Sequence, residues 1–554
     1  MNIPKTFRVG FVFRCSTIAL VVSIISCWVA RATPYASGLT NNAGTVSFIL
    51  NEDADDVKII FGGTTNSIGA QLAGLITTNV SASNPFSVQV TKTSGAGYKT
   101  AVGINAGLRT TAGKIQISTD PLLSRFPTPR GVAVNKNPAS PFFGRVYVAN
   151  STPLVVAGRS VGRGLYTLNA DFSDSPNGYG DTAQTGGLTF AVSANSPYRL
   201  SVGEDDRVYI ADFSDANGNV YRTDGNLLNG EWVFDWVGGP ATVGAPTNHG
   251  STLKAVAEGS LATSDLKIYT VDEDYNGVLN NDVWRYDINS GPLTNQNAPT
   301  LISSALIGGF SVINDICKGG TNKYLYLMQN RVAAANPAAA SSALFVVDTN
   351  GTTLASALTL WRNYTGISTN DNVLTNLNSI AISPDGNYLA GILQSAAGES
   401  DTYIIPLTNG IPNLPSLKIL DTGTIFQGRG VDFDAAGNIY TVSSGDTVLR
   451  SFSPGGFTIA TTGSSGSFNV FSPAPTSPTI TTNQLINSGT QVQIDFSSSN
   501  TLDTEFSFKL QSSALVTGPY LDDNTAVVVS TGTGTFSATA NVSGDTRFYR
   551  IRNF

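Results

Sequence analysis

One pattern recurs along the middle of the chain and restricts the folds open to it. A polar or basic residue is followed by a short apolar strand, a polar turn and a second strand rich in Tyr, Val and Ile. The copies begin at Pro129, Pro197, Leu253, Val312, Leu377 and Gly428. Their spacing of roughly 50 to 70 residues has room for four short strands, the size of one blade of a β-propeller. Because one such unit cannot bury its apolar face alone, the pattern predicts a six-bladed β-propeller over residues 119–471.

The composition favours strands and turns throughout. Charged residues make up only 13% of the 554 residues, and 56 Gly and 25 Pro supply many turns. A coiled coil or a helical solenoid is excluded, because both consist of helices, which so many Gly and Pro residues would interrupt. We therefore expect an all-β protein in which two small β-sandwich modules flank the propeller.

Residues 33–118 show the alternation of a half-buried antiparallel sheet. Val46, Phe48 and Leu50 share one face of a predicted strand, and a second strand of the same pattern follows after an acidic turn. The segment 44–63 resembles the opening of immunoglobulin-like modules of the flagellar-hook-cap type. The resemblance implies an immunoglobulin-like β-sandwich.

The C-terminal region contains a linker and a further module. Residues 472–479 (SPAPTSPT) form a stiff, Pro-rich linker. Five strand candidates follow within residues 480–554, the spacing of a small β-sandwich. The runs FKLQSSALVTGPY and TRFYRIR resemble a C-terminal module that is appended to many secreted bacterial proteins, which implies an accessory role.

The six repeats resemble NHL-type and related periplasmic propellers. The turns that carry the resemblance are SPDG from Ser383 and DAAG from Asp434. It implies an architecture and no chemistry, because enzymes and inert scaffolds share such turns. Two segments are candidates for the strand that closes the ring, KIQIST from Lys114 and FTIATTG from Phe457, and the sequence does not decide between them.

The first 32 residues have the features of a secretory signal peptide. Three bases lie within residues 1–14, an apolar run covers 15–30, and Ala30 and Ala32 are the small residues of a cleavage point. The apolar run is shorter than the roughly 20 residues of a membrane-spanning helix. We favour cleavage after Ala32 and a secreted, extracellular or periplasmic protein. A lipobox-like interpretation would instead place a lipid anchor on Cys27.

Charge and residue counts exclude several classes of function. Asp and Glu outnumber Lys and Arg by 39 to 32, and the signal segment holds four of the bases and no acid. A nucleic-acid partner is not expected, because binding to phosphates needs a basic face. One His and three Cys exclude a zinc site with two or three His and a four-cysteine cluster. Once the signal is removed Cys317 is alone, and we expect a buried, inert thiol.

The residues at the start of each repeat's first strand form the main candidate site. They are Arg130, Arg199, Lys254, Asn314, Asn378 and Arg429. Because the innermost strands line the channel of a propeller, these side chains are predicted to surround one mouth and to bind an anionic or glycan ligand. The alternative is that each base pairs with an Asp of a neighbouring blade and only closes the ring.

A second candidate site is a partial calcium loop. Its ligands would be Asp272, Asp274, Asn276 and Asp282, with a Gly at the sixth position. The match fails at the twelfth position, where Val283 replaces the bidentate Glu. An ordinary turn rich in Asp and Asn explains the same residues. Calcium is the only cofactor that the sequence suggests, and none is required.

No motif points firmly to catalysis. Ser160 lies in a Gly-x-Ser-x-Gly match, but a strand follows it where a nucleophile elbow needs a helix, and His249 is the only histidine. We therefore expect a non-catalytic binding or scaffold protein outside the cytoplasm. The rival hypotheses are a calcium-dependent propeller hydrolase or lactonase and a purely structural surface protein.

Overall fold

The chain is all-β, as expected. The computed structural model describes residues 34–93, 115–116, 121–190, 192, 195–213, 219–233, 252–272, 282–293, 300–303, 313–320, 322–329, 343–355, 377–393, 402–413, 418–420, 427–453, 457–471, 478–498, 505, 508–518, 520–523, 525–532, 534–542 and 547–553. Their regular structure is β-strand, apart from 3₁₀ turns at Leu122–Ser124 and Asn487–Gly489. The predicted signal segment lies outside them. No helix within these residues is long and apolar enough to cross a membrane.

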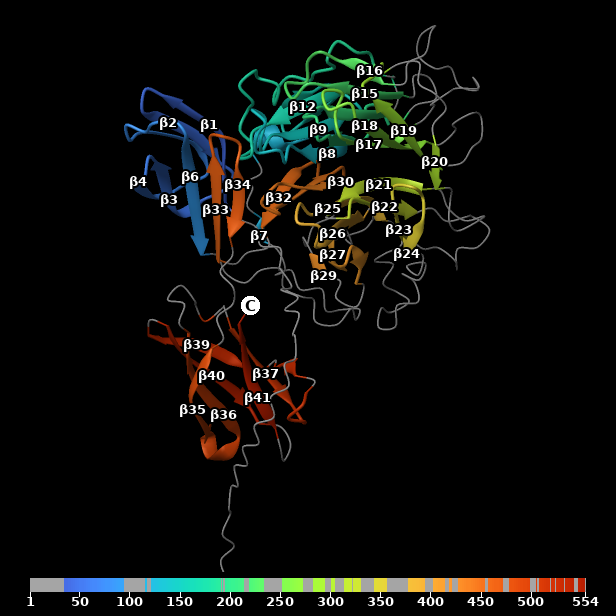
Figure 1. Ribbon diagram of the computed structural model, residues 1–554. Coiled ribbons are helices and arrows are strands. Elements are labelled where there is room, and N and C mark those ends of the chain that lie inside the picture. Colours follow the sequence, from blue (N-terminus) through green and yellow to red (C-terminus); the bar gives the residue numbers. More distant parts are fainter. Residues whose placement is uncertain are drawn as a thin grey trace, which may run out of the picture.

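An N-terminal sandwich consists of two antiparallel sheets (Figure 1). The first has the order β1-β2-β5, made of Ala36–Asn42, Thr45–Leu50 and Gly74–Asn79. The second has the order β34-β33-β6-β3-β4, made of Phe468–Phe471, Phe457–Gly463, Phe86–Thr93, Ala54–Phe61 and Thr64–Gln71. Alternate side chains of facing strands, such as Phe48 and Ile59, form its buried core.

Two strands of this sandwich come from residues far along the chain. β33 pairs with β6 over seven residues, from Phe457 opposite Thr93 to Gly463 opposite Ser87. The propeller is therefore inserted between two neighbouring strands of the sandwich. The sequence places residues 457–471 in the propeller, and this placement is corrected. Alternation of apolar and polar residues identifies a strand but not the strand beside it.

Among the described residues, the middle of the chain forms six antiparallel sheets of three to five strands, one over each predicted repeat, besides one two-stranded hairpin. Sheet 1 contains β8 (Pro129–Val134), β9 (Val146–Asn150) and β12 (Gly164–Leu168). Sheet 2 contains β13 (Leu200–Val202), β14 (Val208–Asp212), β15 (Asn219–Thr223) and β16 (Glu231–Val233). Sheet 3 contains β17 (Thr252–Glu258), β18 (Leu266–Asp272), β19 (Asp282–Asn289) and β20 (Thr300–Ser303).

The second half of the ring continues in the same way. Sheet 4 contains β21 (Ile313–Gly319), β22 (Tyr324–Gln329), β23 (Ala343–Val347) and β24 (Thr353–Ala355). Sheet 5 contains β25 (Leu377–Ile382), β26 (Tyr388–Leu393), β27 (Thr402–Thr408), β28 (Ile411–Pro412) and β29 (Lys418–Leu420). Sheet 6 contains β30 (Gly428–Phe433), β31 (Ile439–Ser443), β32 (Leu449–Ser453) and β7 (Ile115–Gln116).

The first strands of the sheets contact one another in a closed cycle, from β8 through β13, β17, β21, β25 and β30 back to β8. This arrangement is a β-propeller. The short strand β7, which precedes sheet 1 in the sequence, pairs with β32 as the outermost strand of sheet 6. The segment that begins at Lys114 therefore closes the ring. The join is made by hydrogen bonds between strands and covers the outer edge of β32.

The C-terminal residues form a second sandwich. One sheet has the order β35-β36-β40-β39, made of Thr479–Ile486, Gln491–Ser497, Thr535–Asn541 and Val527–Gly532. The other has the order β38-β37-β41, made of Leu521–Asp522, Phe508–Ser513 and Phe548–Asn553. The rings of Phe496, Phe508 and Phe536 lie 4.7 to 5.4 Å apart at its centre. β35 begins at Thr479, the last residue of the predicted linker, and residues 472–477 lie outside the described residues.

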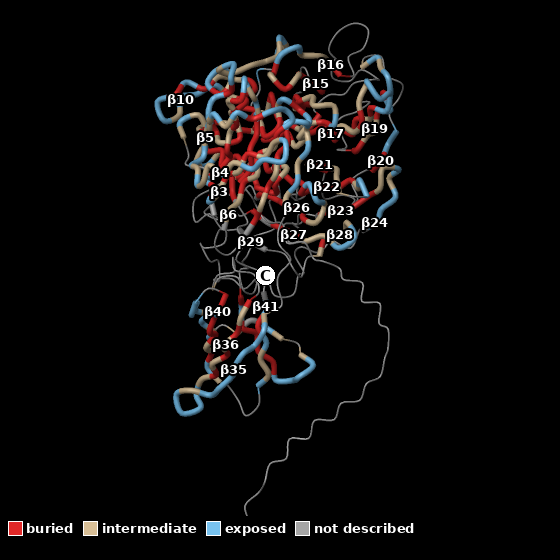
Figure 2. The backbone as a smooth tube through the Cα atoms, turned by 60° about the vertical axis from the view of Figure 1, so that its left-hand side comes forward, coloured by how far each residue is buried: buried red, intermediate tan, exposed pale blue. Residues whose placement is uncertain are grey.

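An aromatic junction joins the N-terminal sandwich to the propeller, and both contain many buried residues (red in Figure 2). The ring of Tyr35 lies 5.4 Å from that of Phe143, in the connection between β8 and β9, and 5.8 Å from that of Phe468 in β34. Beside Tyr35, the fully buried Asp434 accepts hydrogen bonds from the Asn438 amide and from Tyr440 Oη. Burial raises the pKa of Asp434 to about 7, although its hydrogen bonds act to lower it.

The composite sandwich predicts that residues 33–118 do not fold alone. Without β33 the long edge of β6 is unpaired and part of the core is uncovered. We expect dispersed amide signals in the NMR spectrum only when residues 33–93 are joined by a flexible linker to residues 457–471. A folded 33–118 fragment would contradict this.

The buried Asp434 predicts a pH-dependent stability. An unfolded Asp has a pKa of about 3.9, so between about pH 4 and 7 the folded chain binds more protons at this site than the unfolded chain. The free energy of unfolding therefore decreases as the pH rises through this range. We expect calorimetric melting temperatures to show a weaker dependence on pH in Asp434→Asn than in the wild type. Parallel curves for the two proteins would show that Asp434 does not cause the pH dependence.

Candidate functional site

Two Arg-Gly pairs bring neighbouring first strands of the propeller close together. Arg130 and Gly131 lie in β8, and Arg429 and Gly430 occupy the same place in β30. A Cβ atom on Gly430 would lie 3.0 Å from Gly131 Cα and 2.9 Å from Val132 N. A larger residue would push the strands apart, so the two glycines let the backbones approach and place the two arginines next to each other.

Arg199 does not face the mouth but crosses the centre of the propeller. It lies directly before β13, and only 2% of its side chain is exposed. Its guanidinium donates to the backbone oxygen of Asn314 in β21 at 2.7 Å and to both oxygens of Asn378 in β25. One side chain thus links sheet 2 to sheets 4 and 5.

A single carboxylate balances Arg199 and Lys254. Asp315 Oδ1 lies 2.9 Å from Arg199 Nη1 and 3.1 Å from Lys254 Nζ, and Oδ2 accepts the backbone N–H of Ile380 at 2.8 Å. Burial alone would raise the pKa of Asp315, but the charges of Arg199 and Lys254 lower it below its usual value. The group is therefore an ion pair network that connects four sheets.

Three of the six predicted ring residues therefore have internal partners. Lys254 pairs with Asp315 of the neighbouring sheet, as in the alternative interpretation, whereas Arg199 pairs with the same Asp315 two sheets away. Asn378 donates to the backbone oxygen of Gly428 at 2.8 Å. Asn314 is partly exposed, and its backbone oxygen is used by Arg199. The repeat alignment locates Arg199 and Lys254 correctly at the starts of strands, but burial beside a carboxylate decides what they do.

Arg130 and Arg429 are in a different situation. Arg130 Nε donates to Ser151 Oγ at 3.1 Å, and Arg429 Nε donates to Ser444 Oγ at 2.9 Å. Within the described residues neither guanidinium has a carboxylate partner. Burial, together with the positive charges of Arg130 and Arg199, lowers the pKa of Arg429 to about 10. Burial also lowers the pKa of Arg130. Two unbalanced, partly buried cations lie side by side.

The two serines that contact these arginines were not predicted from the sequence. Ser151 follows β9 and Ser444 follows β31, so they occupy one place in two repeats, directly after the second strand. Aligning the ends of the second strands, and not only the starts of the first, would have found them. A hydroxyl that accepts from Nε leaves the outer edge of the guanidinium, with Nη1 and Nη2, to meet a ligand.

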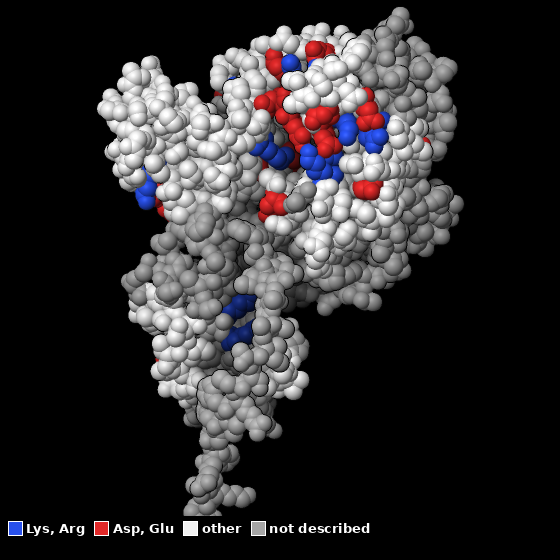
Figure 3. Space-filling model, viewed as in Figure 1, with Lys and Arg blue, Asp and Glu red and all other residues white. Residues whose placement is uncertain are grey.

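The opposite end of the propeller carries charges that are balanced. There Lys323 lies 3.1 Å from Glu258 and 3.5 Å from Glu204, and Lys318 lies 3.1 Å from Glu258. Figure 3 shows acidic and basic side chains next to one another over the propeller. Because Lys318 and Lys323 have acids beside them, they offer weaker attraction to an anion than the arginine pair does.

The predicted calcium residues are only partly described. Asp272 ends β18 and Asp282 begins β19, directly opposite it in the ladder. Asp274 and Asn276 lie outside the described residues. Within the ranges that the structure describes, no three side chains of His, Cys, Asp or Glu gather as a metal site would require. The calcium interpretation stays a prediction.

The catalytic candidates are not brought together in the described structure. Ser160 lies in β11 (Arg159–Val161), opposite Val155 of β10 (Leu154–Val156), in a two-stranded hairpin rather than a strand-to-helix elbow. His249 lies outside the described residues. Cys317 is 6% exposed, and burial raises the pKa of its thiol above the usual value, so the thiol stays protonated and unreactive.

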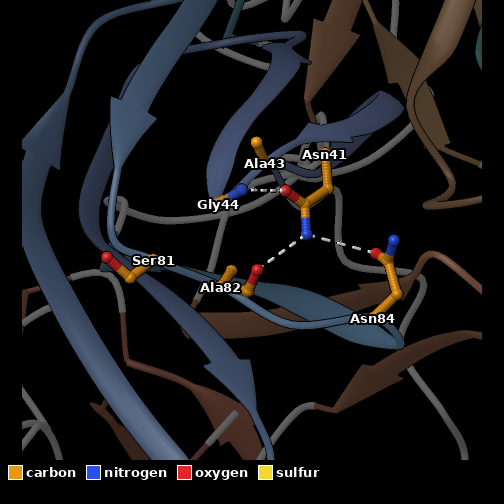
Figure 4. A pocket seen from close by; sticks show the side chains of 6 residues that line it. All are labelled: Asn41, Ala43, Gly44, Ser81, Ala82 and Asn84. Carbon is orange, nitrogen blue, oxygen red and sulfur yellow. Dashed lines mark hydrogen bonds between the residues drawn. The ribbon is translucent and has the colours of Figure 1, made fainter.

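A shallow pocket in the N-terminal sandwich uses its polar groups internally (Figure 4). Asn41 donates to the backbone oxygen of Ala82 at 2.9 Å and to Asn84 Oδ1 at 3.3 Å, and its own Oδ1 accepts Gly44 N–H at 2.9 Å. These bonds fix the turn between β1 and β2, so Asn41 serves the fold.

Comparison with known proteins does not assign an activity to this chain. No protein-family model and no curated protein matches the chain. Among solved structures, a Trichoderma reesei enzyme of carbohydrate-active family AA12 is 13% identical, with 61% of this chain and 97% of that chain covered and a TM-score of 0.34. A glucose dehydrogenase is 10% identical (59% and 96% covered, TM-score 0.36), and the WD40 propeller domain of Doa1 is 12% identical (61% and 96% covered, TM-score 0.33). Similarity at this level says nothing about chemistry.

The network around Asp315 predicts a strong effect on stability. Asp315→Asn leaves Arg199 and Lys254 buried without a balancing charge, which we expect to lower the free energy of unfolding by about 3 to 5 kcal/mol. Denaturant unfolding measures the change. Asp287→Asn, which removes the partner of Arg285 at the surface, is the control and should cost less than about 1 kcal/mol. Equal effects of the two substitutions would contradict the central role of Asp315.

Proposed function

We propose that this chain is a secreted binding protein whose six-bladed propeller takes an anionic ligand at Arg130 and Arg429. One observation carries the proposal: two neighbouring, partly buried guanidiniums have no acid beside them among the described residues. The secretory signal of the sequence supports a place outside the cytoplasm.

The electrostatics of the pair favour an anion. Holding two like charges together in a partly dry site is unfavourable, and the lowered pKa of Arg429 expresses this. A carboxylate, sulfate or phosphate between them would remove the repulsion and accept paired hydrogen bonds from each guanidinium. The two Ser contacts hold the guanidiniums in place beforehand, so little ordering is needed when a ligand binds.

A binding role agrees better with these groups than hydrolysis does. A metal-dependent propeller hydrolase needs carboxylates free to hold the ion or a water at the mouth. Asp315, a carboxylate near the start of β21, is fully buried and engaged by Arg199 and Lys254. Because Arg199 and Lys254 already balance its charge, Asp315 is not free to hold a metal ion or a water molecule at the mouth.

The test is stabilisation by inorganic sulfate. We expect the melting temperature of the wild type to rise with sodium sulfate at an ionic strength held constant with sodium chloride. Arg130→Ala and Arg429→Ala should each weaken the apparent sulfate affinity by at least about tenfold, because one of two paired donors is lost. Arg285→Ala, at a paired arginine of sheet 3, is the matched control and should respond as the wild type does.

A second measurement separates a ligand site from a structural one. Without sulfate, Arg429→Gln should melt no lower than the wild type, because the substitution removes a repulsion between like charges. If the variant instead loses stability without sulfate and keeps the sulfate response, Arg429 is structural and the proposal fails.

A further inference from the structure

An aromatic pair lies beside the arginines at the same end of the propeller. Tyr198 directly precedes Arg199, and its ring centre is 5.2 Å from the Arg199 guanidinium carbon and 5.3 Å from the ring centre of Phe213. A Cβ atom on Gly131, the residue after Arg130, would lie 3.0 Å from the backbone oxygen of Tyr198. The pair therefore continues the site from sheets 6 and 1 onto sheet 2.

Phe213 is the outer member of this pair. β14 runs antiparallel to β13, so Phe213, just after the end of β14, returns to the end where β13 starts. Tyr198 is 9% exposed, whereas Phe213 is partly exposed and packs with its inner side on the core of sheets 3 and 4. A partly exposed aromatic ring offers apolar surface to a ligand.

Two carboxamide side chains lie at the same end of the propeller as the arginines. Asn314 is the second residue of β21, and Gln427 directly precedes β30; both are partly exposed. Gln427 Oε1 accepts a hydrogen bond from Ser444 Oγ at 3.3 Å, next to Arg429. A carboxamide both donates and accepts, which suits hydroxyl groups better than it suits a simple anion.

We infer that the acid held by Arg130 and Arg429 is carried by a pyranose ring that lies against Phe213, so that the ligand is an acidic sugar. The inference rests on the proposed function. The guanidiniums take the carboxylate or sulfate, the phenyl ring covers the apolar face of the sugar, and the carboxamides take its hydroxyls. An anion without a ring would use only the first of these contacts.

Titration calorimetry of the full mature chain tests the inference with defined probes. The acidic sugars are D-glucuronate and D-glucose 6-sulfate, and the matched acids without a sugar ring are propionate, benzoate and methyl sulfate. We expect at least one acidic sugar to bind about tenfold more tightly than its matched acids, the gain expected of one aromatic contact. Phe213→Leu should abolish this advantage and leave the affinity for propionate and methyl sulfate unchanged.

Controls distinguish this inference from the proposed function. Phe142→Leu replaces a partly exposed aromatic residue that lies beside Arg145 at the opposite end of the propeller, and it should change nothing. If all the acids bind equally, if benzoate matches the sugars, or if Phe213→Leu has no effect, the sugar inference is overturned while anion binding stands. If no probe binds and sulfate does not stabilise the protein, the proposed function itself fails.

Discussion

The buried contact of Asp315 with Arg199 and Lys254 holds the centre of the propeller together. Three charged groups lie almost entirely out of water, and each contacts a charged or hydrogen-bonding group of another sheet. A network of this kind stabilises only as a whole, because the loss of one member leaves another charge buried and unpaired. Through it, sheets 2, 3, 4 and 5 are fixed across the axis, independently of the contacts between neighbouring sheets.

The insertion of the propeller into the N-terminal sandwich is the second constraint. Both ends of the propeller segment lead into neighbouring strands, β6 and β33, so the ring is tied at its beginning and at its end. The junction of Tyr35, Phe143 and Phe468 then packs the two bodies together. We expect the sandwich and the propeller to unfold as one cooperative unit for this reason, whereas the C-terminal sandwich has its own core.

The candidate site stands out against this background of satisfied charges. Arg199 and Arg429 occupy the same place in two repeats. Arg199 is buried and paired with Asp315, whereas Arg429 lacks an acid partner among the described residues. The difference depends on Asp315, which Arg199 reaches by crossing the channel. Two unbalanced cations held together reduce stability, and this is the physical basis for proposing an anionic ligand at the site.

The sequence by itself determined the class of the fold, the repeats and the positions at which the basic residues enter their strands. These depend on local alternation and spacing, and local patterns are visible in a single chain. Only the tertiary structure decided that residues 457–471 join β6, that β7 closes the ring, and that Asp315 takes two of the four bases. Each of these is a choice of partner between residues far apart in sequence. Pairing of strands and burial of charge depend on such partners, which no local pattern specifies.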